Sequence, residues 1–433
     1  MMMSYPASIE FLYGLQQRGI KLGLETIEAM LARLGRPHDR YPTLHVGGTN
    51  GKGSTAAMAA AVLQAAGHRV GLYTSPHLVE FRERIRVNGD LIPEDCVSEL
   101  TARVQDATGL ALEPTFFEFT TALALQYFAD AEVDVAVIEV GMGGRFDATT
   151  AVAPLVSAIT NVALDHQEYL GKTVGAVAFE KAGIIKRGVP VVVGRLCPEA
   201  AGVIGRIASE RNAPLFRLGA EFRVAADPLE GFRYDGVREA HAGLSCALPG
   251  AHQLDNAACA LAMLELTAAR GLRHSEDSVR RGLSAVCWEG RLEIVERHPL
   301  LVLDGAHNPA AAEAVAAYLA GHRRAHPDSR VVAVIGMMRD KDREGFLRII
   351  LPLADEVILT QAQTVRAASL EELCASLGEQ GHAVHLAALP GDALSLARRL
   401  ASSGDMICVT GSLMLVGEVK ALLRGCVLSP LRG

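Results

Sequence analysis

The 433-residue sequence lacks the marks of several common protein classes. Its eight cysteines include no C-x-x-C pair, which argues against a disulfide framework or a zinc site and indicates free thiols in a reducing compartment. No uninterrupted apolar run reaches the ~18 residues that a membrane span needs. The first residues show no basic segment followed by an apolar one, so they do not resemble a secretory signal. We therefore expect a cytoplasmic protein that does not associate with membranes.

An excess of positive charge is also missing. Charged residues make up 21% of the chain and the net charge is -7, so no general attraction for nucleic acid or anionic membrane is expected. A polyanionic ligand must instead be held by a local cluster of donors. Hydrophobic residues make up 50%, as in globular proteins, and the length favours two domains over one.

Short β-branched runs alternate with Ala- and Leu-rich helical segments in the first two thirds of the chain. Buried strands are predicted in the runs TLHVGG, RVGLYTS, VDVAVIEVG, PLVSAITNV and VPVVVG. The alternation predicts an α/β domain with a mostly parallel sheet. Asn88-Gly89, between alternating residues, predicts a hairpin turn.

A second series of predicted strands begins at Leu300, in the runs LLVLDGAH, VVAVIGMM, DEVILTQ, AVHLAAL and DMICVTGS. We therefore expect a first domain at residues 1–287, a linker at 288–291 and a smaller α/β domain at 292–433. Such boundaries are accurate to a few residues.

A Gly-rich loop at residues 48–54, here called the phosphate loop, follows a predicted strand and precedes a predicted helix. That context is the one in which backbone N–H groups and a lysine bind phosphate. The sequence departs from the usual phosphate-loop pattern of Gly, four residues and Gly-Lys-Ser/Thr. Val46 stands where the first glycine belongs, and Gly53 separates Lys52 from Ser54. The alternative is a strand-to-helix turn with a solvated lysine. Context favours a nucleotide site of an unusual type.

Polar residues at the ends of later strands lie where ligands of open α/β sheets bind. Ser75, Glu139 and His166 follow or end three of the predicted strands. A carboxylate in a strand as apolar as that of Glu139 needs a partner, and Mg²⁺ bound to nucleotide phosphates is the expected one. The alternatives are an ion pair for Glu139 and a helix cap or core imidazole for His166. For Lys181, spacing alone favours an ordinary surface lysine.

Nine motifs, taken together, resemble folylpolyglutamate synthase, the folate branch of the Mur ligase superfamily, including its bifunctional dihydrofolate synthase form. They occur in order over nearly the whole chain: GGTNGKGST, YTSPHL, IEVGMGGRFDAT, NVALDHQEYLG, FEKAGIIK, GRLEIV, LDGAHNP, DKD and VTGSLMLVGEV. The inserted Gly53 is part of the phosphate-loop motif of this family. The resemblance implies an N-terminal P-loop NTPase-like domain and a C-terminal Rossmann-like domain.

The resemblance also implies residue roles. The ATP phosphates are assigned to the phosphate loop, and the nucleotide-binding residues are Gly48, Thr49, Asn50, Gly51, Lys52, Gly53, Ser54, Asn256, Arg291 and Asp304. The metal ligands are Ser75 and Glu139 for one Mg²⁺ and His166 for a second. The groups closest to the chemistry are Lys52, His166, a carbamylated Lys181 and His307. The substrate-binding residues are Thr74, Ser75, Thr115, Phe146, Asp147 and Ala148.

The implied reaction joins L-glutamate to dihydropteroate or a reduced folate. ATP phosphorylates the acceptor carboxylate, and the amino group of glutamate then attacks the acyl phosphate. The resemblance allows a monovalent cation beside the two Mg²⁺ ions and favours a monomer. Arg82 and Thr150 stand where this family commonly has Asn. Arg82 is expected to be a solvated strand residue or a contact for a glutamate tail, and Thr150 is expected to keep a turn hydrogen bond.

Other functions fit parts of the pattern. A monofunctional folylpolyglutamate synthase, or a Mur-type amino-acid ligase with a non-folate acceptor, would share the loop and the metal set. A cell-wall Mur ligase is disfavoured, because fewer than fifty residues precede the loop and its UDP-sugar domain needs more. A non-catalytic nucleotide-binding regulator would not need Glu139, His166, Lys181 and Asp304 together.

Overall fold

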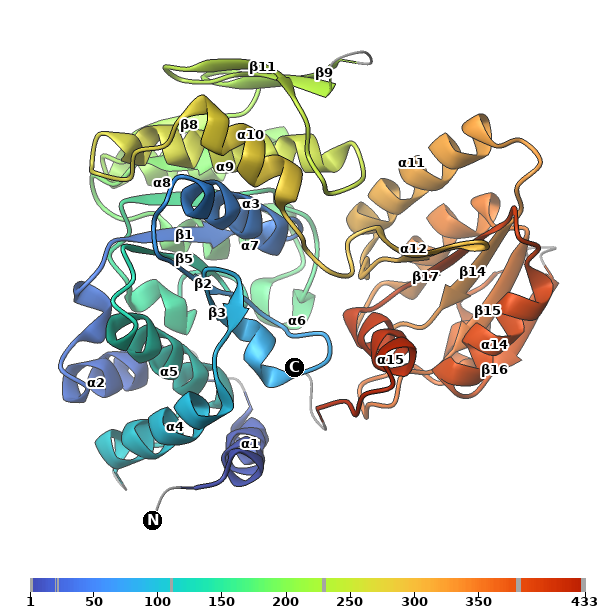
Figure 1. Cartoon of the computed structure of the whole chain (residues 1–433), viewed down its shortest axis with the longest axis horizontal. Helices are drawn as coiled ribbons and strands as arrows, with labels where there is room; N and C mark the ends of the chain where they lie inside the picture. Colours follow the sequence, from blue (N-terminus) through green and yellow to red (C-terminus); the bar gives the residue numbers. More distant parts are fainter. Residues whose placement is uncertain are drawn as a thin grey trace. The chain divides into compact units, whose positions relative to one another are not determined.

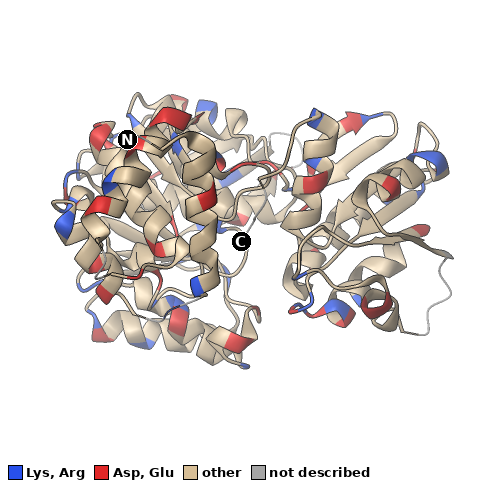
Figure 2. Ribbon diagram, turned by 90° about the horizontal axis from the view of Figure 1, so that it is seen from below, with Lys and Arg blue, Asp and Glu red and all other residues tan. Residues whose placement is uncertain are grey.

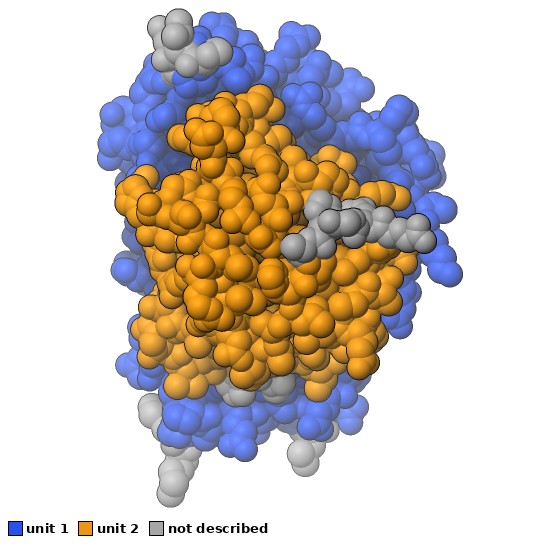
Figure 3. All heavy atoms as spheres, turned by 90° about the vertical axis from the view of Figure 1, so that its right-hand side faces the viewer, with its two compact units in different colours: residues 1–77, 81–247, 254–286 blue, residues 78–80, 248–253, 287–433 orange. Residues whose placement is uncertain are grey.

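The computed structural model describes residues 3–19, 21, 23–109, 112–227, 231–378 and 383–429, which form two compact units (Figure 3). Unit 1 comprises residues 1–77, 81–247 and 254–286; unit 2 comprises residues 78–80, 248–253 and 287–433. Two short segments that the sequence assigned to the first domain thus belong to unit 2. Leu78 and Val79 explain one of them, because both are buried in the hydrophobic core of unit 2.

An eight-stranded sheet in the order β4-β3-β2-β5-β1-β6-β7-β8 forms the centre of unit 1. Its strands are β1 Thr43–Gly47, β2 Val70–Tyr73, β3 Ile85–Val87, β4 Asp90–Leu91, β5 Val135–Glu139, β6 Val156–Ile159, β7 Val191–Val193 and β8 Leu215–Arg217. The six strands from β2 to β8 in this order are parallel. Every residue of β1 and β5 is buried, which explains their nearly continuous apolar sequences. The predicted parallel sheet is confirmed.

The predicted hairpin is confirmed as well. Strands β3 and β4 pair antiparallel at one edge of the sheet. Asn88 and Gly89 between them have φ angles of 51° and 85°. Positive φ at both central residues is what a two-residue type I′ turn requires, and Asn-Gly adopts it at low cost.

Helices cover both faces of this sheet (Figure 1). One face carries α3 Lys52–Ala65, α9 His252–Ala268 and α10 Glu276–Ala285; the other carries α1 Tyr5–Gly14, α2 Glu25–Arg33, α4 Glu94–Thr108 and α5 Phe116–Asp130. Helices α7 Val174–Lys181 and α8 Pro198–Glu210 share a core with β6 and β7. The small side chains of α3 permit close packing: a Cβ on Gly282 of α10 would lie 2.5 Å from the Cα of Val62.

A three-stranded antiparallel sheet in unit 1 was not foreseen from the sequence. It consists of β9 Arg223–Asp227, β10 Gly231–Asp235 and β11 Ala240–Leu244. Only alternate residues of β10, Phe232 and Tyr234, are fully buried. Strands this short and half-exposed carry little of the apolar signal that identified the central sheet.

Unit 2 contains a six-stranded sheet in the order β12-β13-β17-β14-β15-β16. Its strands are β12 Glu293–Arg297, β13 Leu300–Leu303, β14 Val331–Ile335, β15 Glu356–Thr360, β16 Ala383–Ala387 and β17 Met406–Thr410. The five predicted strands are parallel, and β12 adds an antiparallel edge that was not predicted. The predicted C-terminal α/β domain is therefore confirmed.

Alternation along β14 shows how the unit 2 sheet is covered. Val331, Ala333 and Ile335 belong to the core that includes α11 Pro309–Ala325 and α12 Arg343–Ile350. Val332 and Val334 belong to the opposite core, with α14 Pro390–Leu400 and α15 Leu413–Arg424. Because successive side chains of a strand point to opposite faces, the two cores lie on opposite sides of the sheet.

No helix in the described part of the chain is long and apolar enough to span a membrane. Acidic and basic residues are interspersed along the chain in each unit (Figure 2).

Candidate active site

Two glycines of the phosphate loop occupy positions that other residues would not fit. Gly48 has a φ of 139° and Gly51 a φ of 80°, where L-residues are strained. A Cβ on Gly48 would lie 2.0 Å from Oγ1 of Thr160, and one on Gly51 would lie 2.3 Å from Oδ1 of Asn256. Asn256 on α9 thus packs directly against the loop, which begins at the end of β1 and enters the first turn of α3.

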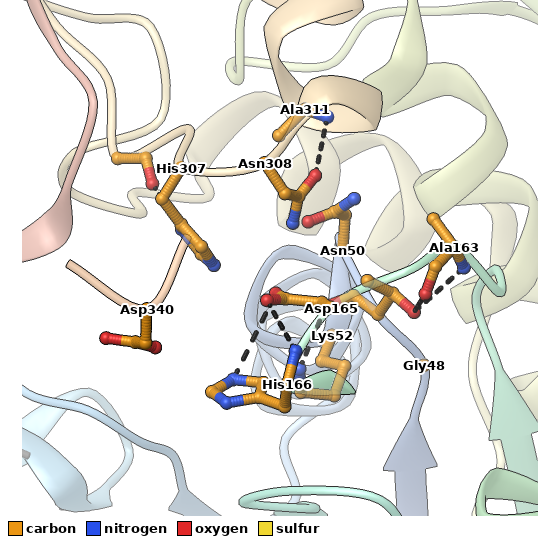
Figure 4. A network of polar contacts seen from close by, with 12 residues as sticks. Gly48, Asn50, Lys52, Ala163, Asp165, His166, His307, Asn308, Ala311 and Asp340 are labelled. Atoms are coloured by element: carbon orange, nitrogen blue, oxygen red, sulfur yellow. Dashed lines mark hydrogen bonds and ion pairs between the residues drawn. The ribbon is translucent and has the colours of Figure 1, made fainter. Parts of the chain in front are cut away.

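Residues after β6 hold the loop in place. The N–H of Asn50 donates to Oδ1 of Asn161 at 2.9 Å, and Nδ2 of Asn161 donates back to the Asn50 carbonyl at 3.0 Å. The Thr49 hydroxyl donates to the Ala163 carbonyl at 3.1 Å and accepts from its N–H at 3.0 Å (Figure 4). Asn161 was missed from the sequence, although it follows a parallel strand and the strand-end rule would have selected it.

Two lysines donate to carbonyl groups of this loop. Nζ of Lys52 lies 3.1 Å from the Thr49 oxygen, and Nζ of Lys181 lies 2.8 Å from the Gly48 oxygen. Burial, together with the charge of Lys52, lowers the pKa of Lys181 to about 7. Lys181 is 3% exposed, which excludes the alternative of a surface lysine. A bound anion would stabilise the positive charge of Lys52 held this way.

The hydroxyls of Ser54 and Thr55, in the first turn of α3, are buried without a hydrogen-bond partner among the described residues. Buried hydroxyls in native proteins are nearly always hydrogen-bonded. The start of a helix also attracts anions, and the hydroxyl of a phosphate loop is a ligand suited to Mg²⁺. These two hydroxyls therefore fit the phosphates and the cation of a bound nucleotide.

Ser75 and Glu139, two of the expected metal ligands, are in contact. The N–H of Ser75 donates to Oε2 of Glu139 at 3.1 Å, and Glu139, at the end of β5, is 4% exposed. Across the described residues, no three His, Cys, Asp or Glu side chains gather closely enough to hold a metal by themselves. A cation here would need hydroxyl and phosphate oxygens as further ligands, a set that suits Mg²⁺ and not zinc.

His166, the third expected metal ligand, precedes the short helix α6 Gln167–Leu170 with a left-handed φ of 48°. Its N–H donates to Oδ1 of Asp165 at 2.8 Å, and its Nε2 lies 4.0 Å from Oδ2 of the same residue (Figure 4). The imidazole makes no capping hydrogen bond and is 34% exposed. His166 thus stands at the N-cap position of α6, but its imidazole neither caps the helix nor is buried in the core.

Asp147 organises the loop at residues 141–150. Its carboxylate accepts from the N–H of Met142 at 2.9 Å and from the N–H and hydroxyl of Thr149 at 3.0 and 2.5 Å. Burial raises the pKa of Asp147, and these hydrogen bonds oppose the shift. Thr150 donates to the Gly144 carbonyl at 2.6 Å, so its predicted turn hydrogen bond is confirmed.

The same loop presses against the helix that carries Lys181. A Cβ on Gly144 would lie 2.8 Å from the carbonyl oxygens of Glu180 and Lys181. Arg145 forms an ion pair with Glu180 at 2.7 Å, and its guanidinium lies 4.2 Å from the centre of the Phe146 ring. Contact between the loop and α7 therefore joins the expected substrate-binding segment to Lys181.

Thr115, an expected substrate-binding residue, is the N-cap of α5. Its hydroxyl accepts from the N–H of Glu118 at 3.2 Å, while its own N–H and hydroxyl donate to the Glu118 carboxylate at 2.8 and 2.9 Å. This reciprocal capping box satisfies N–H groups at the start of the helix. Thr74, after β2, and Ala148, in a 3₁₀ turn, are both buried as well.

In unit 2, polar groups gather at the carboxyl end of β13. Asp304 is 5% exposed and accepts from the N–H groups of Leu292 and Ala306, both at 2.8 Å. Burial raises the pKa of Asp304, and the charge of Arg291 opposes this. Arg291 donates to the carbonyl of Gly290 at 2.9 Å. The linker residue and the buried carboxylate therefore belong to one local cluster.

The next residues of this cluster begin α11. Nδ1 of His307 lies 2.8 Å from the Gly305 carbonyl. Because a carbonyl only accepts, the proton of a neutral His307 is on Nδ1. Asn308 caps α11 by accepting from the N–H of Ala311 at 2.9 Å (Figure 4). Arg82, a departure from the family pattern, lies in the 3₁₀ turn Phe81–Arg84 and not in a strand, as one expectation had it. Its guanidinium lies 3.9 Å from the Glu94 carboxylate, and its side chain is 23% exposed.

Replacing Gly51 by alanine should weaken nucleotide binding. The new Cβ would collide with Asn256, and a left-handed alanine costs about 1–2 kcal/mol. We expect KM for the nucleotide to rise at least about tenfold. Gly67→Ala is the matched control, because Gly67 has a φ of 95° and open space around its Cβ position. Equal effects of the two substitutions on KM would contradict a contact role for Gly51.

Comparisons with known proteins agree on one family. Residues 46–264 match the Mur ligase middle domain and residues 290–413 match the Mur ligase glutamate ligase domain. The chain is 33% identical to dihydrofolate synthase/folylpolyglutamate synthase of Bacillus subtilis, over 98% of this chain and 100% of that protein.

Two solved structures are similar over nearly the full chain. The Escherichia coli FolC complex with DHPP and ADP has a TM-score of 0.89 at 35% identity, covering 98% of each chain. The bifunctional folylpolyglutamate synthase/dihydrofolate synthase of Yersinia pestis, complexed with AMPPNP and Mn ion, has a TM-score of 0.88 at 34% identity, again covering 98% of each chain.

Proposed function

We propose roles for individual residues from one premise: this chain belongs to the folylpolyglutamate synthase/dihydrofolate synthase family of Mur ligases. It is an ATP-dependent ligase that joins L-glutamate to folates. We propose further that it acts as a monomer in the cytoplasm, and that dihydropteroate and a reduced folate are both acceptors.

The reaction has two chemical steps. An oxygen of the acceptor carboxylate attacks the γ-phosphorus of ATP, the bond to the β-phosphate oxygen breaks, and ADP leaves. The amino nitrogen of L-glutamate then attacks the acyl carbon of the resulting acyl phosphate. The bond between the acyl carbon and the phosphate oxygen breaks, and inorganic phosphate leaves. The nitrogen loses a proton, which gives the amide. The first step is electrostatically difficult because two anions must approach each other.

The observation that carries the proposal is the pair of lysines that donate to the phosphate loop. Nζ of Lys52 and Nζ of Lys181 lie against the Thr49 and Gly48 carbonyls of this loop, and Lys52 supplies positive charge there. The Ser54 hydroxyl of the same loop is buried without a partner among the described residues. Lys52 would contact the transferred phosphoryl group and offset its charge. The N–H groups of residues 48–54 would hold the remaining phosphate oxygens. Asn256, already against Gly51, would help to fix the nucleotide.

A divalent cation would supply further positive charge to the phosphates when bound. Ser75 and Glu139 would hold one Mg²⁺, and His166 would hold a second. The family resemblance also allows a monovalent cation. Because the pKa of Lys181 is about 7, about half of the protein molecules carry this side chain as a free amine at neutral pH. A free amine reacts with CO₂ to give a carbamate and a proton, and we propose this modification of Lys181.

The acceptor is assigned to the segment that includes Phe146, Asp147 and Ala148, together with Thr74 and the start of α5 at Thr115. In unit 2, Arg291 and Asp304 would contact the nucleotide, and His307 would lie near the phosphates or the incoming glutamate. For the domains, we keep residues 1–287 as the ATPase part, 288–291 as the linker and 292–433 as the glutamate-ligase part.

A product assay tests this function. The enzyme is incubated with ATP, Mg²⁺ and L-glutamate, with dihydropteroate or tetrahydrofolate supplied separately, and the products are identified by mass. We expect both acceptors to gain glutamate and to release ADP only when glutamate is present. Reaction of only one acceptor would reduce the proposal to a monofunctional enzyme. Absence of glutamate-dependent product from both would favour a Mur-type ligase with a different acceptor.

A further inference from the structure

We propose that His45 is a positioning residue for the acceptor site, acting through Thr149 on Asp147. The inference rests on the proposed function, because Asp147 belongs to the assigned acceptor segment. His45 lies on β1, three residues before the phosphate loop begins at Gly48, and it is fully buried. Its Nε2 lies 2.9 Å from Oγ1 of Thr149, and that oxygen lies 2.5 Å from Oδ1 of Asp147.

The direction of the protons along this chain follows from the donors around Asp147. Both oxygens of Asp147 accept hydrogen bonds from amide N–H groups, Oδ2 from Met142 and Oδ1 from Thr149, and Oδ1 also accepts from the Thr149 hydroxyl. The single proton of the Thr149 hydroxyl must then also point to Asp147. The Thr149 oxygen is left as the acceptor, so Nε2 of His45 must carry the donated proton.

His45 stays neutral, which keeps this arrangement in place over the working pH range. Burial lowers its pKa to about 3, and the charge of Lys186 contributes to the shift. Nδ1 of His45 is buried without a hydrogen-bond partner among the described residues. With Nε2 protonated, this Nδ1 carries a lone pair, which the nearby positive charge tolerates better than an N–H. One tautomer is therefore favoured.

His45 affects the acceptor site through two hydrogen bonds, one to Thr149 and one from Thr149 to Asp147. Asp147 fixes the loop at residues 141–150 from both sides, through Met142 and Thr149. If His45 did not donate, the Thr149 hydroxyl would lose its partner on one side and its direction would no longer be fixed. The Asp147 carboxylate would then hold the loop less well, and Phe146 and Ala148 on either side of it would shift.

Kinetics with separate substrates test this role. In His45→Leu we expect KM for dihydropteroate to rise about tenfold or more, the loss expected for a hydrogen bond that supports a charged group. KM for ATP should change less than about twofold, although His45 lies on the strand that leads into the phosphate loop. His45→Gln, whose amide N–H can occupy the position of Nε2–H, should restore KM for dihydropteroate to within about threefold of the unmodified enzyme.

A second pair of variants, at Thr149, tests the same link even if His45→Leu does not fold. Thr149→Val leaves the imidazole in place and removes the hydroxyl that contacts both His45 and Asp147, so it should raise KM for dihydropteroate at least as much as His45→Leu does. Thr149→Ser keeps the hydroxyl and should behave like the unmodified enzyme. The double variant of His45→Leu and Thr149→Val should be no worse than Thr149→Val alone.

Several results would overturn the inference. Equal rises of KM for ATP and dihydropteroate, failure of His45→Gln to restore binding, or additive losses in the double variant would each reduce His45 to a packing residue. An unmodified enzyme that adds glutamate to neither folate would instead contradict the proposed function, before any variant is made. The two failures are therefore distinguishable.

Discussion

Replacing Lys52 by methionine should lower kcat about a thousandfold while the protein remains folded. Methionine keeps most of the length and apolar volume of the side chain and removes its charge. The lost group is the one that would offset charge on the transferred phosphoryl, and preorganised donors of this kind contribute factors of about 10²–10³. Single-turnover measurement of ADP formation with saturating ATP would give the effect on the chemical step.

Arg270→Met is the control for this substitution. Arg270 is an exposed cation just beyond α9, which ends at Ala268, so the same loss of charge occurs away from the phosphate loop. We expect its kcat to stay within about twofold of the unmodified enzyme. If Lys52→Met kept more than about a tenth of the activity, Lys52 would not act on the transferred group.

Lys181→Met and Lys181→Arg should both lower kcat by about a hundredfold, the loss typical when a residue that supports a metal site is removed. Neither side chain can form a carbamate. Arginine keeps the positive charge, so the pair separates a need for a carbamate from a need for a cation. An active Lys181→Arg enzyme would show that Lys181 acts as a cation and would contradict the proposed modification.

Carbamylation also predicts a dependence on CO₂ and pH. Only the free amine reacts, and with a pKa of about 7 its fraction rises from about one tenth at pH 6 to about nine tenths at pH 8. At a fixed concentration of dissolved CO₂, enzyme freed of CO₂ should therefore regain activity more completely as pH rises across this range. The two Lys181 variants should not respond to CO₂ at all.

The central sheets were predictable because their strands are buried on both faces. Such strands are nearly continuous in apolar residues, as β14 is throughout and as β1 and β5 are apart from Thr43, His45 and Glu139. This signal survives in a single sequence. The half-exposed strands β9 to β11 and the edge strand β12 carry less of it, and they were missed. That segment 78–80 packs in unit 2 depends on tertiary contacts, which no local pattern predicts.

Within the site, residues at the ends of strands could be predicted from the sequence, whereas most of the residues that they contact could not. The phosphate loop, Glu139 and His166 stood out through glycines and strand ends. The capping box of Thr115 was equally visible in the sequence as a Thr followed three residues later by Glu118, but it was not recognised. The link from His45 to Thr149 joins residues 104 positions apart, and no local pattern predicts such a contact.

The most direct test of the account follows an oxygen atom. Dihydropteroate labelled with ¹⁸O in its glutamate-accepting carboxylate would be converted with ATP, Mg²⁺ and L-glutamate, and the released phosphate analysed by mass. If ATP activates that carboxylate as an acyl phosphate, the bridging oxygen leaves with phosphorus, and one ¹⁸O should appear in each inorganic phosphate. Unlabelled phosphate formed together with the glutamylated product would contradict carboxylate activation at the phosphate loop.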